Sequence, residues 1–348
     1  MSRAEAIAEP RMLALAHRLA RDPDPKAVEQ LLAADSSELL HVWDAIAQAK
    51  RWEALGTRIS WAHWVWNWWT GCVKVGTECA HCYAESWAKR GGHKVWGRKA
   101  ARPRTKTWGR VDKMRQLAGD PIWRAWAGLK PGERPRCFVG SLMDWAENRD
   151  DEQRALVAEA WPIIREAVEV DFLMLTKRPQ NIPSLLPADW GEGYPNVWLM
   201  TSCGDPDAVD GELQAPAIFR VEHLLSVPAV VHGVSYEPAL APLARRLAPY
   251  LEPPKPGAAR HVSSWRRSIS WVIYGGESGP GHRPEGVPGD TKRWAREMRD
   301  ACRAAGVAFF HKQSAHRFNE RGVEPDGEIL HEYPAPRVRK AGASQLCL

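Results

Sequence analysis

The sequence predicts an α/β fold in which parallel strands form a sheet, either open or closed into a barrel. Short strand-like runs recur along the chain, and patterns typical of helices separate several of them, for example at 152–168 and 291–305. Strands that alternate with helices in this way indicate a parallel sheet. A length of 348 residues is sufficient for one large barrel domain or for two smaller domains.

The chain begins with a region of helical character. Residues 1–55 carry apolar and charged positions at helical spacing, and Asp35, Ser36 and Ser37 offer N-caps for the last helix. We expect a helical extension at 1–55, a barrel domain at 56–315 and a tail at 316–348. The extension contains no recognisable chemistry.

The first predicted strand begins in the aromatic run WVWNWW at 64–69. We expect its tryptophans to pack in the core and at the lip of the barrel, because aromatic side chains mainly contribute buried area. Six further strand-like runs follow at 135–144, 171–179, 196–205, 230–238, 270–279 and 307–313.

Nearly every one of these six runs is apolar at its start and ends in polar residues or glycine. The ends contain Ser141 and Asp144, Thr176 to Arg178, Thr201 and Ser202, Ser235 and Glu237, Gly275 to Ser278, and Lys312 and Gln313. The carboxyl ends of the strands of a parallel barrel converge on one face, where sites are built. The sequence therefore predicts a shared polar mouth, which the loop after the first strand also reaches.

Composition and charge exclude some classes of protein. A hydrophobic fraction of 44% supports a globular core, and no apolar run approaches the roughly 20 residues of a membrane helix. The N-terminus lacks the apolar region and cleavage site of a signal peptide. We therefore expect a cytoplasmic protein with no membrane contact.

The net charge of +6 is unevenly spread. Residues 89–110 contain nine Lys or Arg and no Asp or Glu, with Trp96 and Trp108 among them. Such a segment suits phosphate contacts combined with stacking on nucleic-acid bases. The alternative is a solvated basic loop in a chain that is rich in arginine throughout.

Three of the seven cysteines form a cluster in the sequence, Cys72-x6-Cys79-x2-Cys82. The other four (Cys137, Cys203, Cys302 and Cys347) are scattered, as expected of small core residues or surface thiols. Structural zinc prefers four ligands, and no second CxxC pair follows, although His81 or His93 could complete such a site. An iron–sulfur cluster held by three cysteines instead leaves one iron open to a substrate or cofactor.

The longer pattern WN...TGC.KV...C..CYAE closely resembles a phage-associated, radical S-adenosylmethionine (SAM)-like family of unassigned function. The resemblance runs from about residue 59 to residue 313 and includes FVGSLMD, LTKRPQNI, NVWLMTS, VSYEPAL, WVIYGGESGPGHRP and AAGVAFFHKQ. That family is itself similar to spore photoproduct lyase, a DNA-repair enzyme. The common radical-SAM spacing is C-x3-C-x2-C, so the loop here is three residues longer.

The resemblance implies a partial (β/α)6-type radical-SAM barrel, with a 4Fe-4S cluster on Cys72, Cys79 and Cys82 and SAM as the second cofactor. It also implies residues that contact SAM or a neighbouring ligand at the strand ends. These are Ser141, Asp144, Lys177, Arg178, Ser202, Gly275, Gly276 and Glu277. Glu237 is a candidate ligand of the substrate or cofactor. The fourth strand usually ends with a Glu-Asn pair in this family, whereas here it continues as Cys203-Gly204-Asp205.

The function we expect is therefore a radical-SAM enzyme that modifies or rearranges a nucleic-acid base or nucleotide, such as the thymidine of phage DNA during hypermodification. It would work in the host cytoplasm and take electrons from a donor such as flavodoxin or ferredoxin. One alternative is repair of a DNA photoproduct, with Cys137 or Cys203 as hydrogen donor, of which Cys203 lies at the carboxyl end of a strand. Another is a zinc-stabilised nucleic-acid-binding protein without enzymatic activity.

Overall fold

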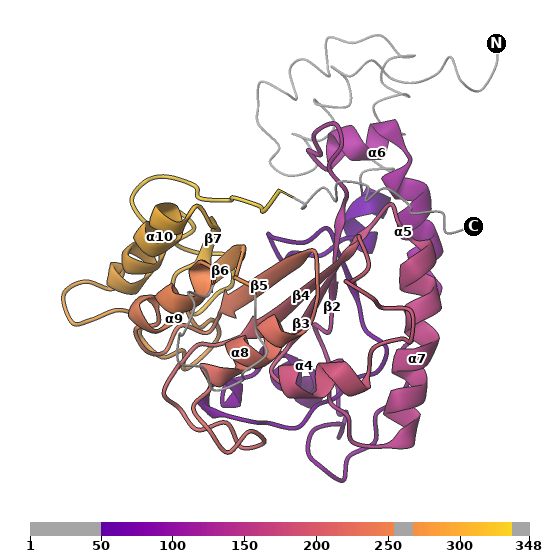
Figure 1. Cartoon of the computed structure of the whole chain (residues 1–348), viewed down its shortest axis with the longest axis horizontal. Helices are drawn as coiled ribbons and strands as arrows, with labels where there is room; N and C mark the ends of the chain where they lie inside the picture. Colours follow the sequence, from indigo (N-terminus) through magenta and orange to yellow (C-terminus); the bar gives the residue numbers. More distant parts are fainter. Residues whose placement is uncertain (1–49, 254–266, 336–348) are drawn as a thin grey trace, which may run out of the picture.

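The computed structural model describes residues 50–253 and 267–335 (Figure 1). The predicted helical extension therefore lies outside the described residues except for 50–55, which are helical, and the tail is described only to residue 335. None of the helices in these two ranges combines the length and apolarity that a membrane crossing requires.

Seven parallel strands form one sheet in which spatial order follows sequence order. They are β1 (Trp64–Trp66), β2 (Arg136–Val139), β3 (Asp171–Thr176), β4 (Val197–Ser202), β5 (Val231–Tyr236), β6 (Trp271–Gly275) and β7 (Ala308–Gln313). Each lies within one of the seven predicted runs. The prediction of a parallel α/β sheet is confirmed, with seven strands in place of the six of the expected barrel type.

The connections between strands carry the helices. These are η1 (Thr77–Cys79), α4 (Tyr83–Arg90), α5 (Arg110–Ala118), α6 (Pro121–Trp126), α7 (Asp151–Glu166), η2 (Pro179–Ser184), α8 (Phe219–Ser226), α9 (Ala244–Leu251) and α10 (Arg293–Ala305). The Asp150 carboxylate caps α7 by accepting from Gln153 N at 2.9 Å, and Gly306 ends α10 with a φ of 65°. The helices predicted at 152–168 and 291–305 correspond to α7 and α10.

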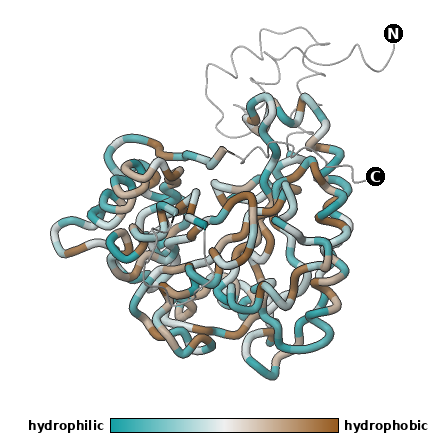
Figure 2. The backbone as a smooth tube through the Cα atoms, viewed as in Figure 1, coloured by the Kyte–Doolittle hydropathy of each residue, from teal (hydrophilic) through white to brown (hydrophobic). Residues whose placement is uncertain are grey.

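Both faces of the sheet are buried, as is usual for parallel strands covered by helices. The outer face packs against the helices through a large cluster that includes Trp64, Trp66, Trp68 and Trp69, each at most 1% exposed. These four tryptophans are core residues, as predicted. The most apolar stretches of the backbone run through the strands at the centre of the molecule (Figure 2).

The sheet curls into a half-barrel, because side chains from distant strands meet on its inner face. The Trp61 ring, which precedes β1, lies 6.3 Å from the Trp271 ring on β6, centroid to centroid. Five strand spacings in a flat sheet would separate β1 from β6 by about 24 Å. A cluster that includes Trp61, Phe138, Trp198, Trp271 and Phe310 fills the inside. Because these aromatics lie mostly toward the strand starts, the carboxyl end remains polar.

The segment after β7 belongs to the same packing unit. His311 N donates to Leu330 O at 2.7 Å, so this segment covers the edge of β7. The Tyr333 ring packs against Trp271, and the Arg136 guanidinium of β2 lies 3.6 Å from the centre of that ring. The part of the predicted tail that the structure describes therefore covers β7 and reaches the start of β2.

Candidate active site at the carboxyl ends of the strands

The polar ends of β2 and β3 meet around the carboxylate of Asp144. This carboxylate accepts hydrogen bonds from Thr176 Oγ1 at 2.5 Å, from Lys177 N at 3.0 Å and from Arg178 Nη1 at 2.9 Å. Asp144 is only 7% exposed. Its oxygens are thus engaged by the neighbouring strand, and its direct role in this structure is to orient the end of β3.

Arg178 connects this strand end to the cysteine loop. Its side chain is 1% exposed and forms ion pairs with Asp144 and Glu212. Arg178 Nη2 donates to Val73 O at 2.7 Å, and Nη1 lies 3.6 Å from Cys72 Sγ. Burial raises the pKa of the Cys72 thiol to about 12, although the Arg178 charge acts in the opposite direction.

A second cation faces the other two cysteines. Alternation along β3 places Lys177 on the inner face of the half-barrel, after Leu173 and Leu175. Burial alone would lower the pKa of Lys177, but the nearby Cys79 and Glu78 outweigh it and raise that pKa. Lys177 therefore lies close enough to the cysteine loop to feel its negative charge.

The cysteine loop leaves β1 through a turn that requires glycine. Gly71 has a φ of 116°, and a Cβ at this position would lie 2.1 Å from Val95 O. Gly71 N donates to Leu142 O at 3.0 Å, which holds the turn against the end of β2. Asn67 strengthens the same junction, because its side chain donates to Ser141 Oγ at 2.8 Å and accepts from Leu142 N at 2.7 Å.

The six-residue gap between Cys72 and Cys79 contains a buried ionic anchor that the sequence analysis missed. Glu78 forms an ion pair with Arg220 at 2.6 Å and accepts a hydrogen bond from Gly204 N. Arg220, on α8, also pairs with Asp210 at 2.6 Å, and all three side chains are at most 2% exposed. The longer loop thus reaches across to α8 and the end of β4. In the sequence, the only sign of this ionic anchor is that a charged residue, Glu78, directly precedes Cys79.

A second anchor fixes the loop on the side of β6. Glu277 pairs with Arg283 at 2.5 Å and with His81 Nδ1 at 3.0 Å, while Arg283 Nη1 donates to Thr77 O at 3.1 Å. Burial alone would raise the pKa of Glu277, but Arg283 and His81 lower it to about 2. Glu277, predicted as a ligand contact, therefore holds the cysteine loop in this structure.

The two glycines before Glu277 are required by packing within the protein. A Cβ on Gly275 would lie 2.9 Å from Glu237 Cδ, and one on Gly276 would lie 2.1 Å from Ala315 N. Gly275 thereby makes room for Glu237, whose carboxylate pairs with Lys312 of β7. Lys312 follows the inward-facing Phe310, so this ion pair lies on the inner face.

Ser202 and Cys203, at the end of β4, point in different directions. Ser202 is 2% exposed and follows Trp198 and Met200 on the inner face. Cys203 is fully buried in the outer cluster that packs against the helices, and this burial raises the pKa of its thiol. Its sulfur therefore lies away from the mouth, and we do not retain it as a hydrogen donor.

The three loop thiols are the candidate ligands of a metal centre. Cys72, Cys79 and Cys82 are free and partly exposed. The described ranges hold no group of three His, Cys, Asp or Glu arranged for a metal ion. Three thiols in one loop, faced by the cations of Arg178 and Lys177, form a donor set that fits a larger anionic cluster.

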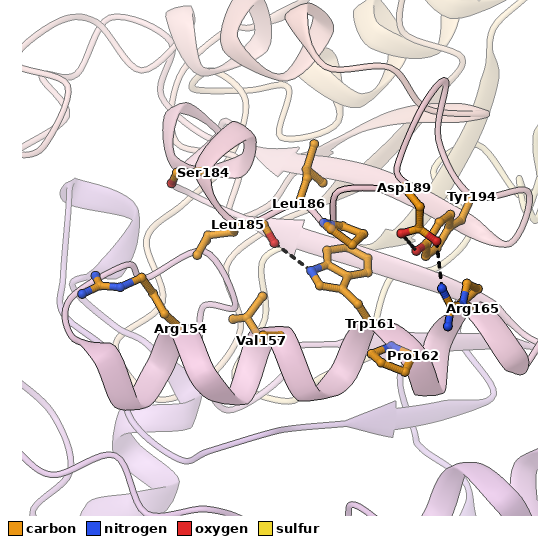
Figure 3. Close-up of a pocket in the computed structure, with 12 residues that line it drawn as sticks. Arg154, Val157, Trp161, Pro162, Arg165, Ser184, Leu185, Leu186, Asp189 and Tyr194 are labelled. Atoms are coloured by element: carbon orange, nitrogen blue, oxygen red, sulfur yellow. Dashed lines mark hydrogen bonds and ion pairs between the residues drawn. The ribbon is translucent and has the colours of Figure 1, made fainter.

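A separate hollow of about 370 Å³ lies on the outer side of the sheet, between α7 and the segment from η2 to β4 (Figure 3). Trp161 Nε1 donates to Leu185 O at 2.7 Å beneath it, and Arg165 pairs with Asp189 at 2.8 Å at its rim. None of the predicted site residues lines it.

Comparisons with known proteins give a family and a structural likeness. A family model described as "Protein of unknown function (DUF5131)" matches residues 56–335. A solved structure of a spore photoproduct lyase mutant is 12% identical, with a TM-score of 0.42 over 76% of this chain and 78% of that chain. No curated protein matches the chain.

Proposed function

This chain belongs to the DUF5131 family, and we propose that it is a radical-SAM enzyme acting on a nucleic-acid base. The observation that carries the proposal is the three-cysteine loop, anchored on two sides at the carboxyl ends of a parallel half-barrel. The similarity of its motifs to a radical-SAM-like family supports the same reading.

Each proposed cofactor has residues suited to it. Cys72, Cys79 and Cys82 would hold a 4Fe-4S cluster, and Lys177 lies where it can pair with an anionic group such as the carboxylate of SAM. When bound, the reduced cluster and SAM would supply the radical chemistry needed to remove hydrogen from an unactivated carbon.

The remaining residues at the mouth bind and orient. Lys312 Nζ donates to a Glu237 carboxylate oxygen, so this pair can hold a proton at Nζ while presenting charge to a substrate on the inner face. Ser202 adds a hydroxyl to that face. The aromatic cluster below them excludes water from the base of the half-barrel.

The cluster chemistry is tested with anaerobically reconstituted protein. We expect iron and sulfide to bind, a broad cluster absorbance, and release of 5′-deoxyadenosine from SAM when reductant is added. Cys79→Ala should lose both properties, whereas Cys302→Ala, which removes a buried thiol of α10, is the matched control. Turnover by Cys79→Ala at the wild-type rate would refute the proposal, and about one zinc per chain with no iron would favour the zinc alternative.

The substrate is tested separately. The phage association of the similar family makes hypermodification of DNA thymidine the first reaction to examine. Nucleoside digests of DNA made with and without this gene, compared by mass spectrometry, should differ in one modified base. An unchanged digest combined with activity on ultraviolet-damaged DNA would favour repair.

A further inference from the structure

The predicted basic segment divides into two parts with different surroundings. In its second half, Arg102 is buried and pairs with Glu147 at 2.8 Å, while Arg104 pairs with Glu159 and lies over the Trp108 ring. Trp108 Nε1 in turn donates to Trp68 O at 3.2 Å. These residues hold the chain after α4 to the barrel, so they are not available to a nucleic acid.

The first half presents free cations to solvent. Arg90, Lys94, Arg98 and Lys99 are all exposed, and across 50–253 and 267–335 no carboxylate forms an ion pair with any of them. No acidic residue occurs between Glu85 and Asp112. A concentration of unpaired positive charge of this kind attracts phosphate groups.

Exposed aromatic rings lie on α4, the helix that ends at Arg90. Ala84 and Ala88 form the buried side of α4, so Tyr83, Trp87 and Arg90 share its outward side. Tyr83 is 51% exposed and Trp87 is 46% exposed, whereas the tryptophans of β1 are completely covered. The Trp87 ring stacks with the His93 ring at 6.1 Å and an interplanar angle of 23°.

This surface is continuous with the mouth of the half-barrel. Tyr83 directly follows Cys82, and its hydroxyl donates to Ser141 O at 2.6 Å at the end of β2. A chain that follows the outward side of α4 is therefore led toward the cysteine loop. Trp87 lies one helical turn after Tyr83 on α4, and His93 follows shortly after the end of that helix. Their paired rings offer a stacking platform for a base.

We propose that the outward side of α4 and the loop 91–99 bind a single nucleic-acid strand. A base stacks on the Trp87–His93 pair, and Arg90, Lys94, Arg98 and Lys99 contact phosphates. This inference rests on the proposed function for its link to catalysis, and it identifies the substrate as a polymer strand rather than a free nucleotide.

Fluorescence anisotropy with a labelled single-stranded oligonucleotide tests the binding without any cofactor. Trp87→Ala should weaken binding about 5- to 150-fold, as expected for loss of one base stack, and Trp87→Phe should restore most of it. The double variant Lys94→Gln/Lys99→Gln should reduce the slope of log K against log salt by about 1.4, which corresponds to two phosphate contacts on a single strand. Arg245→Gln, an exposed cation on α9, is the matched control.

Several outcomes would overturn the inference. These are equal affinity of wild type and Trp87→Ala, tighter binding of the matching duplex than of the single strand, displacement of the oligonucleotide by equimolar free nucleotide, or binding to anionic vesicles but not to the oligonucleotide. Oligonucleotide binding that follows these expectations in a protein that releases no 5′-deoxyadenosine would refute the proposed chemistry and leave the strand-binding surface standing.

Discussion

Replacing Arg220 with methionine tests whether the buried ionic anchor determines the position of the cysteine loop. The change removes the cation that pairs with both Glu78 and Asp210 and leaves two carboxylates, each at most 2% exposed, without that partner in the protein interior. Breaking a buried pair from one side costs about 3–5 kcal/mol, because the remaining charge is desolvated and uncompensated.

This loss of folding free energy is measurable as a decrease in the melting temperature. For a chain of this size, 1 kcal/mol corresponds to roughly 2 °C, so Arg220→Met should melt about 6–10 °C below wild type. Glu78→Gln should cost less, since its amide oxygen still accepts from Gly204 N or from Arg220. After reconstitution, both variants should bind less iron per chain than wild type.

Circular dichroism melts of the full chain measure the effect, and Arg293→Gln provides the control. Arg293 pairs with Glu297 on the surface of α10 at 2.8 Å, and an exposed pair four residues apart contributes only about 0.3–0.5 kcal/mol. Melting of Arg220→Met within about 1 °C of this control, with full iron content, would show that the anchor is not needed.

Three further predictions concern the loop and its neighbours. Gly71→Ala should abolish iron binding in reconstituted protein, because its Cβ collides with Val95 O, whereas normal iron content would contradict the turn. Glu277 stabilises the fold above its unfolded pKa of about 4.3, and this contribution is lost as the pH falls toward about 2. Between these two pH values, the melting temperature of Glu277→Gln should therefore fall less steeply with falling pH than that of wild type. Identical curves of melting temperature against pH would count against the pairing with Arg283. Cys203→Ala should keep its 5′-deoxyadenosine release within twofold, and complete loss would return Cys203 to the site.

The parallel direction of the strands could be predicted from sequence because it depends on local pattern. Apolar runs of strand length with helical segments between them specify a parallel sheet, and polar residues at the run ends specify its active face. The tryptophans of 64–69 were assigned correctly to the core for the same reason, since buried area is a property of the residue type.

The curvature of the sheet and its closure could not be predicted in this way. Contact between Trp61 and Trp271 depends on the accumulated twist of the intervening strands, and no pattern in either segment encodes the other. The packing of Tyr333 under Arg136 likewise joins residues about 200 positions apart. For this reason the segment after β7 read as a tail, although it covers the edge of the sheet.

Within the site, the residue types predicted where polar side chains gather, but not which groups those side chains contact. Asp144 and Glu277 were taken as ligand contacts from the family resemblance, yet each is held by an arginine of the protein, Arg178 and Arg283 respectively. Carboxylates with such neighbours organise the backbone around a site. The inner-face residues Lys177 and Lys312 are the cations that we propose for contact with a bound ligand, and Lys312 is paired with Glu237 in this structure.

The two anchors explain why the cysteine loop is three residues longer than the common spacing. A shorter loop could connect three thiols, but it would lack Glu78 and so the ion pair that extends to α8. With Glu78 held on one side and Thr77 and His81 on the other, the backbone on both sides of Cys79 is fixed before any cofactor binds. Preorganisation of this kind reduces the entropy lost on binding. Because burial raises the pKa of Cys72, the proposed cluster would have to displace its proton, and Arg178, beside that sulfur, is placed to stabilise the thiolate that would result.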